Sequence, residues 1–176
     1  RFAHTISVQQ RTAIGNVSAN QFLVSGNVYL PGIIPTHSFV LGASYQARDT
    51  LSEYFFTNNF ALARGYPGID FPRMWKGAVN YHFTIAYPDW GFANVVYFQR
   101  IRANLFFDYS AVKSLRSSTV TPLRSVGTEV YFDTKWWNAF PVSFGVRFSH
   151  LLDTDLLNPL VKNRWEILLP ISLIPD

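Results

Sequence analysis

The 176-residue sequence contains no cysteine, and only 15% of its residues are charged. The absence of cysteine excludes a disulfide scaffold and any metal or iron–sulfur site built from cysteine ligands. The charge content is low, because an ordinary soluble domain has about 25% charged residues. Aromatic residues make up 17% of the chain, and a chain with few charges and many aromatics is not disordered. The composition therefore indicates one β-rich domain, residues 1–176, with aromatic side chains on its surface.

The sequence also lacks a basic run and a long apolar run. The formal net charge is +4, and the densest basic cluster is Arg100 with Arg102. Nucleic-acid binding needs a clustered basic stripe, so we expect no nucleic-acid partner. Residues 12–47 carry no charged side chain, but asparagines and prolines interrupt them. No stretch of about 18 apolar residues survives, so any membrane crossing is expected to use strands. Because the chain begins at Arg1 without a methionine, we expect a processed or partial chain.

Apolar and polar residues alternate along most of the chain. In residues 77–87, for example, Val79, Tyr81 and Phe83 share one face, while Asn80 and His82 share the other. The same alternation recurs in residues 2–9, 21–30, 38–46, 97–109, 125–133, 142–152 and 164–173. Successive side chains of a strand point to opposite faces, so the pattern predicts about eight strands. Each has about ten residues, a length that crosses a bilayer core when the strand is tilted.

The connections between these strands differ in length. Residues 31–36, 88–95 and 134–141 are short connections, whereas 48–76, 111–122 and 153–162 are longer. Short turns on one side and long loops on the other are typical of a transmembrane antiparallel up-and-down β-barrel of an outer membrane. Four aromatic residues at the short-turn side are predicted to lie at the membrane interface. These interface aromatics are Trp90, Trp136, Trp137 and Phe140.

The polar faces of the predicted strands carry charges in mid-strand. The charges predicted to face the barrel lumen are Arg100, Arg102, Glu129, Arg147, Arg164 and Glu166, together with Asp108. The opposite faces carry almost no charge. A soluble β-sandwich or lipocalin-like barrel has the same period with its apolar face turned inward. The loop alternation and the aromatic residues favour the membrane barrel.

Two short motifs are placed together by this strand order. The longest connection, residues 48–76, contains Arg64-Gly65-Tyr66, and Phe106 and Asp108 form a Phe-x-Asp motif on the second strand after it. With three strands before the loop and five after it, the sequence resembles the BamA/TamA-type superfamily of outer-membrane assembly and secretion barrels, the bacterial surface antigen family. In that superfamily the loop folds into the lumen and its arginine meets the aspartate. The resemblance implies that this chain is the carboxy-terminal half of a sixteen-stranded barrel.

The resemblance further implies a loop latch, consisting of Arg64, Gly65, Tyr66, Asn80, Phe106 and Asp108. A guanidinium in a narrow lumen requires a partner, and a carboxylate matches its planar fork. Gly65 would let the loop turn tightly and approach the wall. Asn80 stands where the family often has a glutamate, which leaves Asp108 as the main expected partner. Family barrels usually end in an aromatic residue, whereas this chain ends at Asp176 and has Pro170 in its last predicted strand, which removes one ladder donor.

The function implied by the resemblance is insertion or translocation of proteins or lipids across the outer membrane of a Gram-negative-type (diderm) bacterium. The expected partners are outer-membrane lipid, other subunits of an outer-membrane complex and a translocated protein. The four histidines have no ligand spacing, so we expect no metal site, no cofactor and no enzyme. The one candidate catalytic pair is His150 with Asp153.

Three alternatives stay open at the level of the sequence. The first is a small closed eight-stranded outer-membrane barrel with a structural, adhesin or complex-accessory role; its lumen would be filled by side chains. The second is a barrel whose remaining strands come from another chain. The third is a soluble β protein that binds an apolar ligand.

Overall fold

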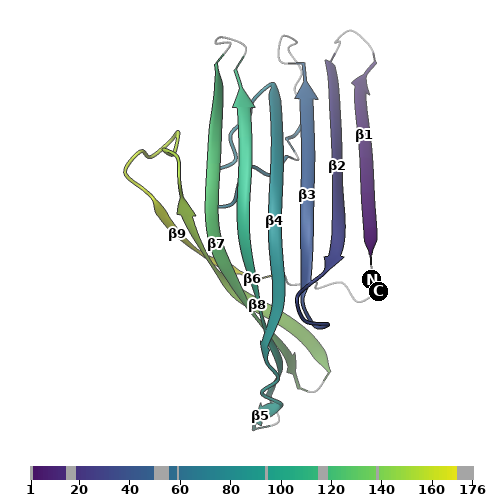
Figure 1. Ribbon diagram of the computed structural model, residues 1–176, viewed down its shortest axis with the longest axis vertical. Helices are drawn as coiled ribbons and strands as arrows, with labels where there is room; N and C mark the ends of the chain where they lie inside the picture. Colours follow the sequence, from purple (N-terminus) through teal and green to yellow (C-terminus); the bar gives the residue numbers. More distant parts are fainter. Residues whose placement is uncertain are drawn as a thin grey trace.

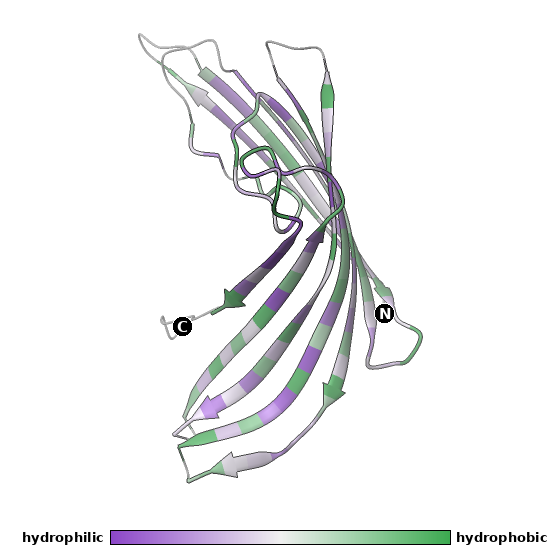
Figure 2. Ribbon diagram, turned by 90° about the vertical axis from the view of Figure 1, so that its left-hand side faces the viewer, coloured by the Kyte–Doolittle hydropathy of each residue, from purple (hydrophilic) through white to green (hydrophobic). Residues whose placement is uncertain are grey.

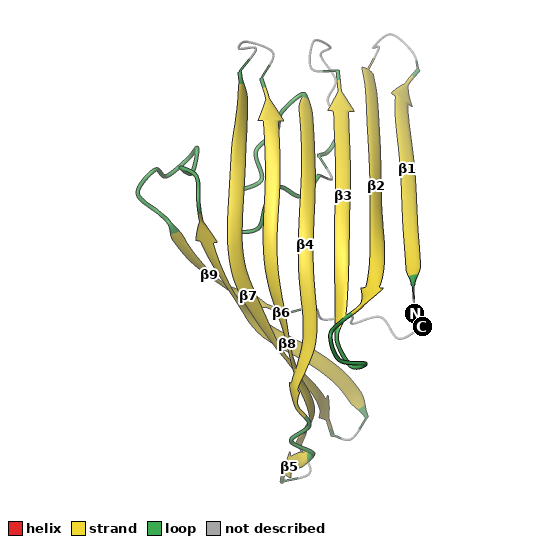
Figure 3. Ribbon diagram, in the orientation of Figure 1, coloured by secondary structure: helices red, strands yellow, loops and turns green. Residues whose placement is uncertain are grey.

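The structure is a computed structural model that describes residues 2–14, 19–49, 56–58, 60–93, 95–114, 119–137 and 139–169. These residues form an all-β, antiparallel up-and-down sheet (Figure 3). The strands are β1 (Ala3–Ala13), β2 (Ala19–Pro31), β3 (Ser38–Arg48), β4 (Arg73–Ala86), β5 (Trp90–Phe92), β6 (Val96–Lys113), β7 (Val120–Trp136), β8 (Phe140–Leu151) and β9 (Asn163–Leu168). Within the described ranges, no helix is long and apolar enough to cross a membrane.

The eight longer strands pair in sequence order, β1-β2-β3-β4-β6-β7-β8-β9, and the short β5 pairs only with β6. The sheet is not closed, since β1 and β9 form its two edges. In Figure 1, β1 to β4 stand side by side and β7 to β9 curve away from them. Figure 2 shows the resulting bend, with the connection between β3 and β4 on the concave side. We call this side the concave face and the other the convex face.

The pairing register brings polar side chains from separate strands into one row on the concave face. His82 of β4 pairs with Asn104 of β6, Asn104 with Glu129 of β7, and Glu129 with Arg147 of β8. Arg147 in turn pairs with Glu166 of β9. A slip of one residue in any pair would move a whole strand's side chains to the other face. The register is therefore what positions the site described below.

The polar face of the sheet is buried and the apolar face is exposed, which is the reverse of a soluble sheet. On β6, Asn104, Phe106 and Asp108 are buried on the concave face. On the convex face of the same strand, Leu105 is 49% exposed, Phe107 42% and Tyr109 39%. A soluble antiparallel sheet does the opposite, since its apolar face packs on the core and its polar face meets water. The alternation predicts two faces, and the structure shows that the polar one is covered.

The apolar core lies between the concave face and the connection from β3 to β4. Its buried members are Phe60, Leu62, Ala63, Tyr66, Met74, Val112, Leu123 and Leu151. The first four belong to the loop segment 60–71, and the others come from β4, β6, β7 and β8. Each large side chain buried in this way contributes about 1.5–3 kcal/mol. The loop is therefore packed onto the sheet and forms half of the core.

Several predicted boundaries are corrected by the structure. The part of the chain that the structure describes contains nine strands, because β5 forms within the predicted turn 88–95. The predicted loop 48–76 is shorter, since β3 ends at Arg48 and β4 begins at Arg73. The predicted loop 111–122 is wrong at both ends, because β6 reaches Lys113 and β7 begins at Val120. Val112 and Leu123 lie on the concave face and pack under the loop segment. The concave face is therefore apolar at these positions, and the alternation of polar and apolar residues that predicts a strand is interrupted. Pro170 and Asp176 lie outside the described residues.

Candidate functional site

Arg64 is the centre of the candidate site, and its main partner is Asp108. The Arg64 side chain donates from Nε to Oδ2 of Asp108 at 2.8 Å and from Nη2 to Oδ1 at 2.7 Å. The backbone N–H of Arg64 also donates to Oδ2, at 2.9 Å. Asp108 is fully buried, and paired N–H donors facing both carboxylate oxygens are the strongest form of such a contact. The carboxylate therefore fixes both the side chain and the backbone of the loop.

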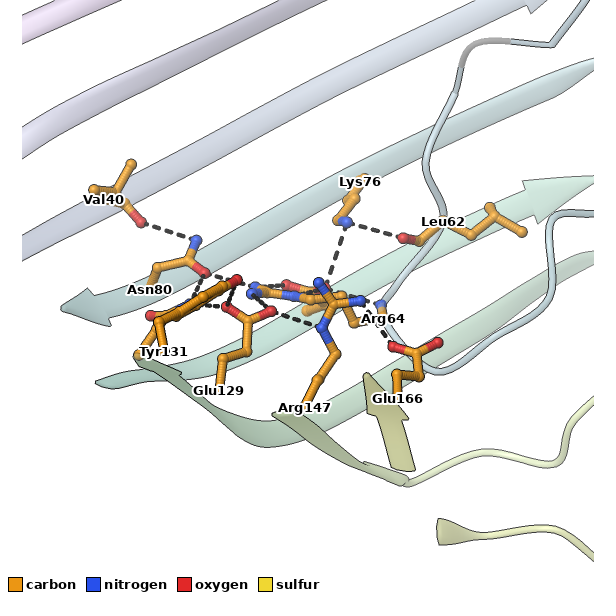
Figure 4. A network of polar contacts seen from close by, with 11 residues as sticks. Val40, Leu62, Arg64, Lys76, Asn80, Glu129, Tyr131, Arg147 and Glu166 are labelled. Carbon is orange, nitrogen blue, oxygen red and sulfur yellow. Dashed lines mark hydrogen bonds and ion pairs between the residues drawn. The ribbon is translucent and has the colours of Figure 1, made fainter. Parts of the chain in front are cut away.

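Three further side chains of the concave wall complete the surroundings of Arg64, and Figure 4 shows two of them, Asn80 and Glu129. Asn80 accepts a hydrogen bond from Nη2 at 2.6 Å, and Glu129 accepts one from Nη1 at 3.2 Å. The ring of Phe106 lies under the guanidinium, with Cζ 3.7 Å from the ring centroid, which adds a cation–π contact. Asn80 thus offers Arg64 an amide oxygen in place of a carboxylate, and Glu129 supplies the second carboxylate beside Asp108.

The contacts of Arg64 continue into a balanced charge network. We define the Arg64 network as the three cations and three carboxylates Arg64, Lys76, Arg147, Asp108, Glu129 and Glu166. Lys76 Nζ lies 3.4 Å from Asp108 and donates to the carbonyl of Leu62 at 2.9 Å. Arg147 bridges Glu129 at 2.6 Å and Glu166 at 2.8 Å. Since buried charges are costly unless paired, the equal numbers allow the loop to be held without an uncompensated charge.

Gly65 lies in the left-handed backbone region, with φ of +86°, which glycine adopts readily because it has no Cβ. The residue also lies directly against β8. A Cβ at this position would be 2.8 Å from both Cδ2 of Leu151 and Cβ of Ser149. Two independent constraints therefore require glycine between Arg64 and Tyr66.

Tyr66 fixes the loop at a second point. Its hydroxyl donates towards the carbonyls of Arg124 at 2.9 Å and Asp153 at 3.0 Å, and it accepts from the N–H of Asp153. Burial raises the pKa of the Tyr66 phenol. Asp153 itself pairs with the Arg124 guanidinium at 2.8 Å, and the hydrogen bonds from Arg124 hold the pKa of Asp153 below its usual value. Tyr66 thus joins the loop to β7 and to the connection after β8.

We expect Tyr66→Phe to lower the free energy of unfolding by about 1 kcal/mol, because the ring still fills the core while the hydroxyl contacts are lost. Chemical denaturation in detergent measures this difference. The matched control is Tyr45→Phe, since Tyr45 is exposed on the convex face and its change should stay within about 0.5 kcal/mol. Equal effects of the two substitutions would contradict a fixing role for the Tyr66 hydroxyl.

The predicted lumen charges all lie on the concave face, but in three separate groups. Glu129, Arg147 and Glu166 belong to the Arg64 network. Arg100 and Arg102 share the carboxylate of Asp133, at 2.7 Å and 3.1 Å. Arg164 pairs with the fully buried carboxylate of Asp155, at 2.5 Å.

The four predicted interface aromatics lie at the end of the sheet that carries the short turns (Figure 1, lower end). Trp90 stacks on Phe98 with ring centroids 6.0 Å apart. Trp136 and Phe140 both meet Trp137, with centroids 5.8 Å and 6.5 Å apart. Trp90, Trp137 and Phe140 are largely exposed.

His150 and Asp153, the candidate catalytic pair, each contact a different partner. His150 contacts Asn163, with Nδ1 2.7 Å from Oδ1, while the Asp153 carboxylate is engaged by Arg124. The structure does not bring the candidate pair His150–Asp153 together. The described ranges contain no group of three or more histidine, aspartate or glutamate side chains placed to hold a metal ion. The arrangement around Arg64 is suited to holding a loop in position, because its donors and acceptors satisfy one another.

Lys76 and Asn104 belong to the site, although neither is among the residues that the sequence motifs indicate. Asn104 donates to Glu129 at 2.8 Å and to Asn80 at 3.1 Å. The alternation of faces along each strand could have indicated both residues. Lys76 shares a face with Asn80, and Asn104 shares a face with Asp108. Lys76 was missed because it was assigned to the loop.

The comparisons with known proteins give no independent assignment. No protein-family model, no curated protein and no solved structure matches this chain.

Proposed function

We propose that this chain forms part of the wall of a transmembrane β-barrel in the outer membrane of a diderm bacterium, where the barrel inserts or translocates proteins or lipids. The observation that carries the proposal is the reversed coverage of the sheet. Apolar side chains are exposed along the convex face, while Asn104, Asp108 and Glu129 are buried on the concave face. An apolar face exposed over many strands is unfavourable in water and favourable against lipid, as on the outer surface of a transmembrane barrel.

The dimensions of the convex face agree with this proposal. On β6 the convex side chains run from Ile101 to Tyr109, and a strand advances about 27 Å over that length. The apolar band of outer-membrane barrels is about 25 Å tall. Tyr45 and Trp75, which are register partners, lie with Tyr109 near the loop end of the band. They would form a second aromatic belt opposite Trp90 and its neighbours.

The open sheet supports a barrel larger than this one sheet. β1 and β9 are paired on one side only, and an unpaired edge is unfavourable in lipid because its backbone groups have no partner. Further strands, from the same polypeptide or from a second chain, would complete the wall. The assembly or translocation role rests on the resemblance to the BamA/TamA-type superfamily and on the loop held by Arg64 on the concave face.

A spin-label scan tests the membrane proposal, and the absence of native cysteine makes it simple. Single cysteines at Val24, Leu41 and Val79 place labels on the convex face. Labels at Ser25, Ser44 and Ala78, which line a cavity on the concave side, provide the matched controls. In reconstituted liposomes, we expect high oxygen and low nickel-chelate accessibility at the convex positions.

At the concave positions we expect the reverse, because they would face a water-filled lumen. Nickel-chelate accessibility at all six positions would contradict the membrane proposal and favour a soluble β protein.

A further inference from the structure

A cavity of about 330 Å³ lies on the concave face, apart from the Arg64 network and towards the short turns. It is lined by side chains of β3, β4, β6 and β7, including Ser38, His82, Thr84, Arg100 and Arg102. The register explains this meeting, since Ser38 pairs with His82 and Thr84 pairs with Arg102. Hydroxyl, imidazole and guanidinium groups therefore surround one space.

The charge in this cavity is not balanced. Two arginines line it and no carboxylate does. Both arginines are held from behind by one residue, Asp133, which also accepts a hydrogen bond from Ser143 at 2.8 Å. This contrasts with the Arg64 network, where three cations meet three carboxylates. One positive charge at the cavity is thus left over.

Arg102 also keeps guanidinium N–H donors from which no described residue accepts a hydrogen bond. Arg102 reaches Asp133 through Nε, at 3.1 Å and 3.2 Å, and its guanidinium lies on the Tyr131 ring with Cζ 4.4 Å from the centroid. Among the described residues, its two Nη groups donate no hydrogen bond. The Arg100 side chain is 45% exposed and that of Arg102 is 37% exposed, so a ligand can reach both.

We propose that this cavity is a binding site for a phosphate group. Two guanidinium groups recognise an oxyanion well, and the site is preorganised because Asp133 and Tyr131 fix the arginines. The hydroxyls of Ser38 and Thr84 and the imidazole of His82 line the cavity along with the arginines. Donors on more than one side suit the several oxygens of a tetrahedral phosphate better than the two oxygens of a planar carboxylate. The phosphate is either the free ion or the headgroup of a lipid.

Isothermal titration of the purified protein tests the site, in a non-ionic detergent at constant ionic strength. Inorganic phosphate is one probe and glycerol 3-phosphate, a soluble lipid headgroup, is the other. We expect at least one probe to bind, and the double variant R100Q/R102Q to weaken its binding by about tenfold or more. Arg164→Gln is the control, because Arg164 also lies on the concave face but pairs with Asp155, and it should bind as the unmodified protein does.

A second variant keeps the test valid if the double variant does not fold. Arg102→Gln alone leaves Arg100 paired with Asp133, so phosphate binding should become several-fold weaker. Binding of inorganic phosphate identifies the free ion as a ligand, whereas binding of glycerol 3-phosphate alone identifies the headgroup. The proposal is overturned if neither probe binds, or if affinity is the same in R100Q/R102Q, Arg102→Gln and the unmodified protein.

Discussion

Replacing Arg64 with alanine is expected to release the loop segment 60–71 from the concave face and to lower the free energy of unfolding by about 3 kcal/mol. The substitution removes the paired donors from the fully buried Asp108, leaving only Lys76 at 3.4 Å as its charged partner. Glu129 is less affected, because Arg147 stays within 2.6 Å of it. The large effect arises from the charge that is left buried, as well as from the contacts that are lost.

Limited proteolysis and chemical denaturation in detergent measure the two consequences separately. Arg100→Ala is the matched control, since it removes another concave-face arginine, while the carboxylate of Asp133 keeps Arg102 as its partner. Arg64→Lys should be intermediate, because lysine keeps the charge but lacks the planar fork. In the double variant R64A/D108A the loss should be smaller than the sum of the single losses. An unchanged proteolysis pattern in Arg64→Ala, together with an unchanged free energy of unfolding, would refute the role given to Arg64.

Much of the sheet could be predicted from the sequence because a strand repeats every two residues. Phe107 and Asp108 are neighbours in the chain and lie on opposite faces, as their parity predicts. The alternation does not determine which of the two faces is buried, since a soluble sheet has the same period of two residues. The long connection 111–122 was also mispredicted, because apolar residues such as Val112 lie on the concave face and pack under the loop segment.

The site was predictable in part. The pairing of Arg64 with Asp108 was expected from the two motifs, and the structure contains it. The participation of Glu129 was not expected, because its place beside Asn104 depends on the pairing of β6 with β7. Residues brought together by register, across separate strands, have no common sequence signal. The cavity at Arg100 and Arg102 could not be predicted for the same reason, because Ser38 belongs to a strand far away in the sequence and reaches the cavity only through the register.

The charged contacts and the apolar contacts of the loop segment have different roles in holding it on the sheet. Arg64 satisfies buried carboxylates, while Leu62, Ala63 and Tyr66 fill the core beside it. A charged network alone is not expected to add much net stability, because desolvation offsets most of the Coulombic gain. The apolar contacts therefore supply most of the net stability of the packed loop segment. That packing depends on Arg64, because it buries Asp108, whose charge must then be paired. The backbone conformation at Gly65, between Arg64 and Tyr66, must therefore be fixed for both sets of contacts to form.

Gly65→Ala tests that control, and we expect it to lower the free energy of unfolding by about 3 kcal/mol. An alanine would be strained at φ of +86°, and its Cβ would lie 2.8 Å from Leu151 and Ser149. Gly68→Ala is the matched control three residues on, since a Cβ there meets nothing within 4 Å, and its effect should stay within about 0.5 kcal/mol. Chemical denaturation of both variants measures the difference. Equal stabilities would mean that the loop does not lie against β8, and the geometry given to Arg64 would then fail with it.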